Sequence, residues 1–271
     1  MRIARPITGG ALLALFLSAG IAAEAQQNPL ARQQPKGLGV SPTFEGWFPN
    51  PDGTFTLSFG YLNRNTEEIV EIPVGPGNFV EPGEVDQGQP TYFTPRRHYG
   101  VFAVKVPADF GPDDRVTWTL EVHGERYSIP GGLLGSYQTD NLHASGTNKR
   151  PPVVVLEDEG VESRGPAGAW VGPLRARAGE PLPLDVTSWD EDGKAVTLRW
   201  FKYRGPGEVT FANPELPIEE GNEQAATTAV FSVEGEYVLY VRADHSETPV
   251  SAAGLEQCCW TNGYVRVNVT R

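Results

Sequence analysis

The stretch Thr54-Phe55-Thr56-Leu57-Ser58-Phe59-Gly60-Tyr61 alternates strictly between a small or polar residue and a large apolar one. Large apolar side chains at every second position share one face of an extended chain, which predicts a half-buried β-strand. The turn residues Asn50-Pro51-Asp52-Gly53 come just before it. They predict a hairpin with Trp47 and Phe48 on the partner strand.

Similar short strands recur along a chain that contains 31 glycines and 24 prolines. In the first half they are predicted at 69–72, 99–106, 116–122 and 127–129. In the second half they are predicted at 153–156, 181–186, 196–202, 226–233, 237–243 and 264–269. Short strands with turn residues between them are typical of β-sandwiches, whereas the proline-containing segment 75–94 is predicted to be a long loop.

A polar stretch at 136–152 interrupts this pattern and ends in Lys149-Arg150-Pro151-Pro152. Because a Pro-Pro pair is stiff and the stretch has no core-forming pattern, we interpret it as a linker between two domains. The predicted fold class is all-β, with two tandem immunoglobulin-like β-sandwiches at 41–135 and 153–271 that follow a signal peptide.

The first residues have the pattern of a secretory signal peptide, predicted to end at residue 25. Arg2 and Arg5 precede an apolar run at 11–17, and Ala23-Glu24-Ala25 supplies the small residues of a cleavage point. The apolar run is shorter than the roughly 20 residues that a transmembrane helix needs, so no transmembrane segment is expected. We expect export through the general secretory route to the periplasm or the cell exterior.

Two further observations narrow the environment and the partners. The polar, proline- and glycine-containing residues 26–40 are predicted to form a flexible tail. The net charge of −12 argues against a nucleic-acid partner, because such a partner requires a basic surface. The expected partner is a protein or a glycan of the cell envelope.

Residues 179–243 resemble immunoglobulin-like modules of the PKD and REJ type from secreted bacterial proteins. The matching segments are Gly179–Leu184, Asp190-Glu191-Asp192-Gly193, Leu198-Arg199-Trp200, Gly205–Phe211 and Phe231–Leu239. The resemblance implies an extracellular β-sandwich that mediates spacing, adhesion or surface contact without catalysis. Trp200 is expected to fill the core and Tyr237 to be a corner tyrosine. A long insertion from His245 to Tyr264 departs from the pattern.

The insertion contains the only two cysteines, in the segment Cys258-Cys259-Trp260. Thiols of exported proteins tend to oxidise, so a vicinal disulfide is predicted, although it strains the peptide and closes almost no loop. Two free thiols, or one thiol bonded to a partner chain, are the alternatives. We interpret Cys258, Cys259 and Trp260 as the candidate binding site, in a loop where Trp260 either contacts a partner or pins the loop to the core.

The acidic turn Asp190-Glu191-Asp192-Gly193 is a second candidate site. Its oxygens suit Ca²⁺, with Asp190 and Asp192 as the candidate metal ligands. The alternative is an acidic hairpin turn in which aspartate and glycine serve only the backbone geometry. A soft-metal site of the two thiolates with His245 is a further alternative. No other cofactor is expected.

No spacing of residues in the sequence matches a known catalytic motif. The four histidines lie at positions 98, 123, 143 and 245, and none is at ligand spacing from another. Arg96-Arg97-His98 is interpreted as a solvated strand end, with contact to an anionic group as the alternative. The predicted function is a secreted, non-catalytic binding or surface-contact module. The alternatives are a passive spacer of an envelope assembly and a hydrolase whose site is assembled by the fold.

Overall fold

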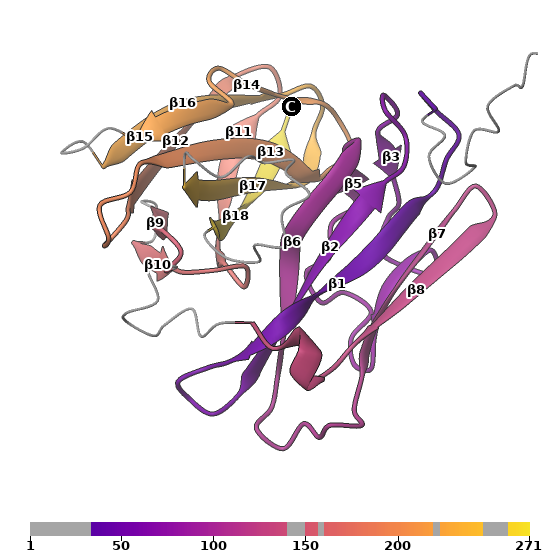
Figure 1. The fold of residues 1–271 in the computed structure, drawn as a ribbon. Coiled ribbons are helices and arrows are strands. Elements are labelled where there is room, and N and C mark those ends of the chain that lie inside the picture. Colours follow the sequence, from indigo (N-terminus) through magenta and orange to yellow (C-terminus); the bar gives the residue numbers. More distant parts are fainter. Residues whose placement is uncertain (1–33, 140–149, 157–159, 219–222, 246–259) are drawn as a thin grey trace, which may run out of the picture. The chain divides into compact units, whose positions relative to one another are not determined.

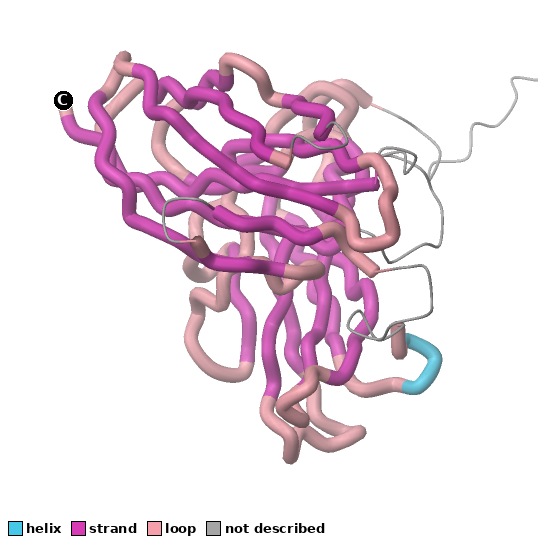
Figure 2. The backbone as a smooth tube through the Cα atoms, turned by 90° about the vertical axis from the view of Figure 1, so that its left-hand side faces the viewer, coloured by secondary structure: helices cyan, strands magenta, loops and turns pink. Residues whose placement is uncertain are grey.

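The computed structural model describes residues 34–139, 150–156, 160–218, 223–245 and 260–271. These residues are almost entirely strands and turns, and their one helical element is the 3-10 turn η2 (Gly135–Tyr137), as Figure 2 shows. The all-β fold class is therefore confirmed. No helix within the described ranges is long and apolar enough to cross a membrane.

The N-terminal sandwich consists of antiparallel sheets built around the predicted hairpin. One sheet has the order β1 (Val40–Pro49), β2 (Phe55–Asn63) and β6 (Arg96–Val106). The second has the order β4 (Asn78–Glu81), β7 (Val116–Val122) and β8 (Glu125–Gly131), beside a short pair of β3 (Val70–Glu71) and β5 (Tyr92–Phe93). The hairpin is confirmed, because Trp47 pairs with Leu57 and Phe48 pairs with Thr56.

The core of this sandwich contains side chains of both sheets. Trp118 of β7 is fully buried and meets Phe102 of β6 edge-on, with 4.9 Å between ring centroids. Phe59 of β2 stacks on the same Phe102 at 5.4 Å. Apolar side chains on alternate positions of β2 and β7 therefore close one hydrophobic core, as the period of two predicts.

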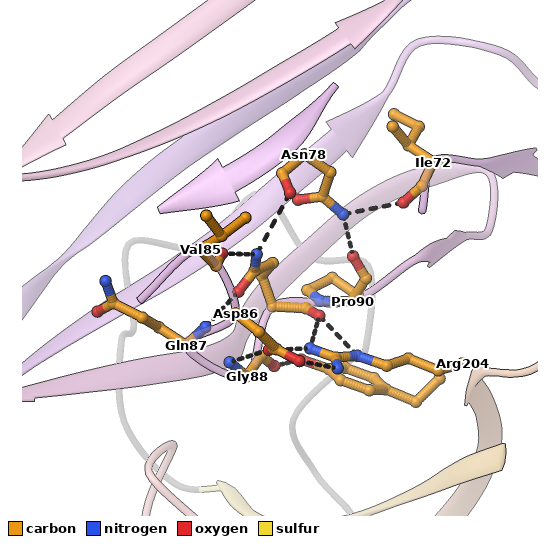
Figure 3. A network of polar contacts seen from close by, with 10 residues as sticks. Ile72, Asn78, Val85, Asp86, Gln87, Gly88, Pro90 and Arg204 are labelled. Atoms are coloured by element: carbon orange, nitrogen blue, oxygen red, sulfur yellow. Dashed lines mark hydrogen bonds and ion pairs between the residues drawn. The ribbon is translucent and has the colours of Figure 1, made fainter. Parts of the chain in front are cut away.

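The prediction of a long loop at 75–94 is wrong, because this segment contains β4 and β5. The sequence pattern missed these strands because they lack apolar alternation. Hydrogen bonds from polar side chains hold the segment in place. The fully buried Asn78 side chain donates to the carbonyl oxygens of Ile72 (2.9 Å) and Pro90 (2.7 Å) and accepts from the Trp118 indole (3.0 Å). Figure 3 shows the carbonyl contacts of this network.

The C-terminal sandwich has two five-stranded sheets (Figure 1). The first has the order β10 (Val161–Ser163), β9 (Val153–Leu156), β12 (Pro181–Trp189), β16 (Gln224–Phe231) and β14 (Val209–Phe211). The second has the order β11 (Ala169–Arg177), β18 (Trp260–Thr270), β17 (Gly235–His245), β13 (Val196–Arg204) and β15 (Glu215–Ile218). Strand β11 runs parallel to β18, and the other pairs are antiparallel.

Two features identify this sandwich as immunoglobulin-like. Trp200 of β13 is buried among core residues of both sheets. Tyr237, near the start of β17, donates its hydroxyl to the carbonyl oxygen of Val233 at 2.9 Å, which is the geometry of a tyrosine corner. Both residues occupy the positions that the sequence predicts for them.

Strand β18 begins earlier than predicted, since residues 260–263 were assigned to a loop. These residues pair with β17, with Trp260 opposite Asp244. Their polar side chains are buried on the strand, where Thr261 bonds to the Pro152 carbonyl oxygen and Asn262 to the Gly100 carbonyl oxygen. A strand with buried polar groups on it shows no apolar alternation, so the sequence pattern missed its start.

Candidate functional site

Of the three residues predicted as a binding site, the structure describes only Trp260, since Cys258 and Cys259 lie outside the described residues. Trp260 is the first residue of β18 and is 3% exposed. The Arg242 guanidinium lies 4.5 Å from its ring centroid. Gly100 packs so closely against the indole that an added Cβ would overlap it. This burial agrees with the alternative in which Trp260 anchors its segment to the protein core. It leaves little indole surface for contact with a partner.

The acidic turn carries its own cations and hydrogen-bond donors. The Asp190 side chain, 1% exposed, accepts from the backbone N–H groups of Asp192 (2.9 Å) and Lys194 (3.0 Å) and lies 2.7 Å from His245 Nε2. Asp192 pairs with Arg150 at 2.7 Å, and this hydrogen bond lowers the pKa of the Asp192 carboxyl. The carboxylate oxygens proposed for Ca²⁺ therefore bond to backbone and arginine, and the described residues contain no cluster suited to a metal ion.

The segment Arg96-Arg97-His98 is less solvated than predicted. Only Arg96 is exposed; Arg97 pairs at 2.7 Å with Glu45, whose side chain β1 places in the interior. His98 stacks on Tyr61 at 4.7 Å, and its Nε2 lies 2.9 Å from the Thr94 hydroxyl. Burial lowers the pKa of His98 to about 4.

A histidine beside a hydroxyl is the arrangement that the hydrolase alternative requires. The space around His98 shows whether a substrate could reach this pair. The cavity lined by His98, Thr94, Tyr61 and Lys202 measures about 20 Å³. That is room for a single water molecule. The pair therefore has no space for a substrate and is part of the packing between β6 and β13.

The outer face of the sheet β13-β17-β18 carries a cluster of buried tyrosines. Tyr203, Tyr240 and Tyr264 pack ring against ring, with Trp170 stacked on Tyr264 at 4.3 Å. Residues of the N-terminal sandwich close this face. Tyr264 donates to the carbonyl oxygen of Val101 (2.7 Å), and Tyr203 donates to that of Gly88 (2.6 Å).

An ion pair continues this contact at the end of β13. Arg204 holds both carboxylate oxygens of Asp86, at 2.7 and 2.8 Å (Figure 3). It also donates from Nε to the Gln89 carbonyl oxygen at 3.0 Å. The hydrogen bonds from Arg204 lower the pKa of the Asp86 carboxyl. Residues 86–91, within the segment predicted as a loop, thus contact the second sandwich. We call this whole contact the joint: Tyr203, Arg204, Arg242 and Tyr264 against residues 86–91 and 99–101.

The C-terminal sandwich has an apolar cleft between β11 of one sheet and β12 of the other sheet. It has a volume of about 430 Å³ and adjoins a second hollow of about 640 Å³ along the same two strands. The apolar lining of the cleft consists of Leu156, Val171, Leu174, Leu182, Pro183, Leu184, Trp200 and Val265. Arg175 and Asp185 are the charged residues of its wall.

The cleft lies beside the part of β12 that has no described contact with β9. Strand β9 pairs with β12 only over Val186–Trp189, so within the described chain the segment 181–185 has a partner strand, β16, on one side only. Pro181 and Pro183 lie on this segment and Pro173 on β11. Proline has no N–H to donate, so these edges resist the addition of a strand from another chain. The cleft is therefore better suited to apolar side chains than to strand pairing.

Comparisons with known proteins do not assign the chain to a family: no family model and no curated protein matches it. Among solved structures it is similar to the D00-D0 domain of intimin, with 9% identity, 86% of this chain and 100% of that chain covered, and a TM-score of 0.29. It is also similar to domains 4 and 5 of the S-layer protein SbsC, with 13% identity, 63% and 71% covered, and a TM-score of 0.27. Similarity this distant adds nothing to the assignment, which rests on the geometry of the chain.

Proposed function

We propose that the chain is an exported, non-catalytic contact protein that binds a protein partner of the cell envelope through the cleft between β11 and β12. The observation that carries this proposal is the lining of the cleft, which is apolar and reaches Trp200 of the core. Apolar pockets with few polar groups bind apolar groups, such as the side chains of a protein, whereas glycans require many hydrogen-bonding partners.

The side chains of the cleft support a role in binding. Asp185 is the one side chain of the described lining that could act as a nucleophile or general base, and the lining includes no histidine, cysteine, serine or lysine beside it. His98, the histidine that lies beside a hydroxyl, borders a space of about 20 Å³. The joint covers the outer face of β13-β17-β18, whereas the cleft between β11 and β12 is open and has an apolar lining.

The N-terminal sequence and the family resemblance agree with this proposal. The predicted signal peptide at 1–25 implies export, and PKD- and REJ-type modules are contact modules without catalysis. The passive spacer remains the competing function, and it requires no occupant for the cleft.

The proposal is tested by placing a photo-crosslinking amino acid at Leu174 or Leu182 in the producing cells. Both side chains line the cleft and are partly exposed. Leu134, which directly precedes the 3-10 turn η2 and is 44% exposed, is the matched control. We expect crosslinks to an envelope protein from the two cleft positions and none from position 134. Equal crosslinking from all three positions, or none from any, would favour the passive spacer.

A substitution separates binding from folding. Leu182→Ser adds a hydroxyl to the wall of the cleft, and Leu134→Ser makes the same change outside it. The Leu182→Ser protein is expected to lose the crosslink made from position 174 while its thermal unfolding remains cooperative. An undiminished crosslink would exclude the cleft as the site.

A further inference from the structure

We infer that the outer face of the sheet β13-β17-β18 is an interaction surface whose partner is the N-terminal sandwich of the same chain, and that the joint makes the two sandwiches unfold as one cooperative unit. This inference does not depend on the proposed function. A chain whose sandwiches were connected only by the predicted linker at 136–152 would instead unfold in two independent steps.

The buried hydroxyls of the joint show that the face is specific for its partner. Tyr264 is fully buried and Tyr203 is 3% exposed, and their acceptors are backbone carbonyl oxygens of the other sandwich. A buried hydroxyl without a partner is costly, so the native packing of these rings requires the carbonyl oxygens of Gly88 and Val101. Their bonds are lost together when the joint opens.

A buried cation makes the same point. Arg242 of β17 is 7% exposed, bonds to Asp244 at 2.7 Å, and donates to the carbonyl oxygen of Tyr99 at 2.9 Å. Lys202 of β13 reaches Glu71 at 3.1 Å and lies over the ring of Tyr92. Buried charges need such partners, and these partners come in part from the opposite sandwich.

The backbones themselves approach closely at two glycines. The N–H of Thr91 donates to the carbonyl oxygen of Tyr203 at 3.3 Å. A Cβ added to Gly88 would lie 3.3 Å from the Trp170 ring, which is a tight contact, and a Cβ on Gly100 would overlap the indole of Trp260. A side chain at Gly100 would therefore push the two sandwiches apart, away from the hydroxyl contacts of the joint.

The described residues of both sandwiches belong to one compact unit, although each sandwich has its own hydrophobic cluster. Two hydrophobic cores joined by many short polar contacts are expected to unfold together as long as the joint is intact. Coupled unfolding follows, because loss of either core removes the partners of the other's buried polar groups.

The test uses the full chain and compares Gly100→Ala with Gly124→Ala. Both glycines have positive φ, +48° at Gly100 and +76° at Gly124, but a Cβ on Gly124 meets nothing within 4 Å. Denaturant unfolding is followed by hydrogen exchange of the core strands β7 and β17. For the unsubstituted chain and Gly124→Ala we expect both strands to lose protection at one denaturant concentration, and for Gly100→Ala at two.

Tyr203→Phe provides a milder variant in case Gly100→Ala does not fold. It removes only the hydroxyl, which bonds to the carbonyl oxygen of Gly88 at 2.6 Å and lies 3.3 Å from that of Val101. It is expected to speed amide exchange at residues 86–91 about fivefold, without affecting the turn at Gly124. Separate unfolding of β7 and β17 in the unsubstituted chain would overturn the inference. So would a single transition in Gly100→Ala, or unchanged exchange at 86–91 in Tyr203→Phe.

Discussion

Arg204 and Asp86, 118 positions apart in the chain, face each other through two parallel hydrogen bonds. The planar guanidinium matches both carboxylate oxygens, which a lysine ammonium cannot do. The Asp86 side chain is half exposed, so water and salt weaken the charge attraction and the fork geometry matters more.

Replacement of Arg204 by lysine is therefore expected to reduce the free energy of unfolding by about 1 kcal/mol although the charge is retained. Arg126→Lys, at the exposed pair with Glu121, is the control and is expected to change it by less than about 0.5 kcal/mol. Urea denaturation of the two variants measures the difference. Equal effects would show that the fork at Arg204 contributes no more than a surface ion pair.

Stability is expected to fall as the pH drops from about 6.5 towards 4, because of His98. Burial, with Arg242 and Arg97 nearby, lowers the pKa of the folded imidazole to about 4, while the unfolded value is about 6.5. The unfolded chain thus binds a proton first, and up to about 3 kcal/mol of stability is lost across this range. His98→Gln should flatten the dependence of the unfolding free energy on pH between 6.5 and 4; an unchanged slope would assign it to other groups.

Asn78→Ala is expected to lower the free energy of unfolding by roughly 3 kcal/mol, because it leaves the Trp118 indole and two carbonyl oxygens without their partner. Asn213→Ala makes the same change at an exposed position and should cost little. Guanidinium denaturation measures both variants. Similar losses in the two proteins would mean that other groups replace the Asn78 amide.

Calcium is expected to have little effect on the melting temperature, since the Asp190 and Asp192 carboxylates already bond to N–H groups and to Arg150. Asp190→Ala should instead lower stability by about 1–2 kcal/mol whether or not Ca²⁺ is present, through loss of the turn and of the contact with His245. Melting curves with calcium and with chelator provide the test. A large calcium-dependent rise that both Asp190→Ala and Asp192→Ala abolish would establish a calcium site.

Cys258 and Cys259 are expected to be bonded to each other in protein produced by export, as the sequence predicts. Alkylation without reductant should then add no mass to the intact chain, and alkylation after reduction should label both thiols. Labelling without reductant would indicate free thiols, and a doubled mass that reductant reverses would indicate a bond to a partner chain.

The sequence predicts best those strands on which apolar and polar residues alternate. Leu57 and Phe59 of β2 alternate with Thr56 and Ser58, but the strand is not half-buried as predicted, because both of its faces are covered. The hairpin, Trp200 and Tyr237 follow from equally local patterns. Strand β11 was missed because Gly172 and Pro173 interrupt it where its pairing with β18 shifts register.

The joint could not be predicted, since its contacts run from side chains to backbone atoms more than a hundred positions away. No local pattern marks Gly88 or Val101 as the acceptors of Tyr203 and Tyr264. The cleft was missed for a related reason, because it lies between β11 and β12, which belong to different sheets. Gly100, inside the strand predicted at 99–106, was the nearest sign in the sequence, because a glycine within a strand indicates close approach of another segment.

The joint forms between two parts of the same molecule, so the two sandwiches need only a low intrinsic affinity for each other to stay in contact. The two sandwiches are parts of one chain, and a covalent connection between two binding surfaces gives an effective concentration on the order of 1 mM. Two separate chains that bound each other with a Kd of about 10 µM would be largely dissociated at nanomolar levels, yet the connected pair is closed about 99% of the time. A contact of moderate strength is therefore sufficient, and the fraction of molecules in which the joint is closed does not depend on the protein concentration.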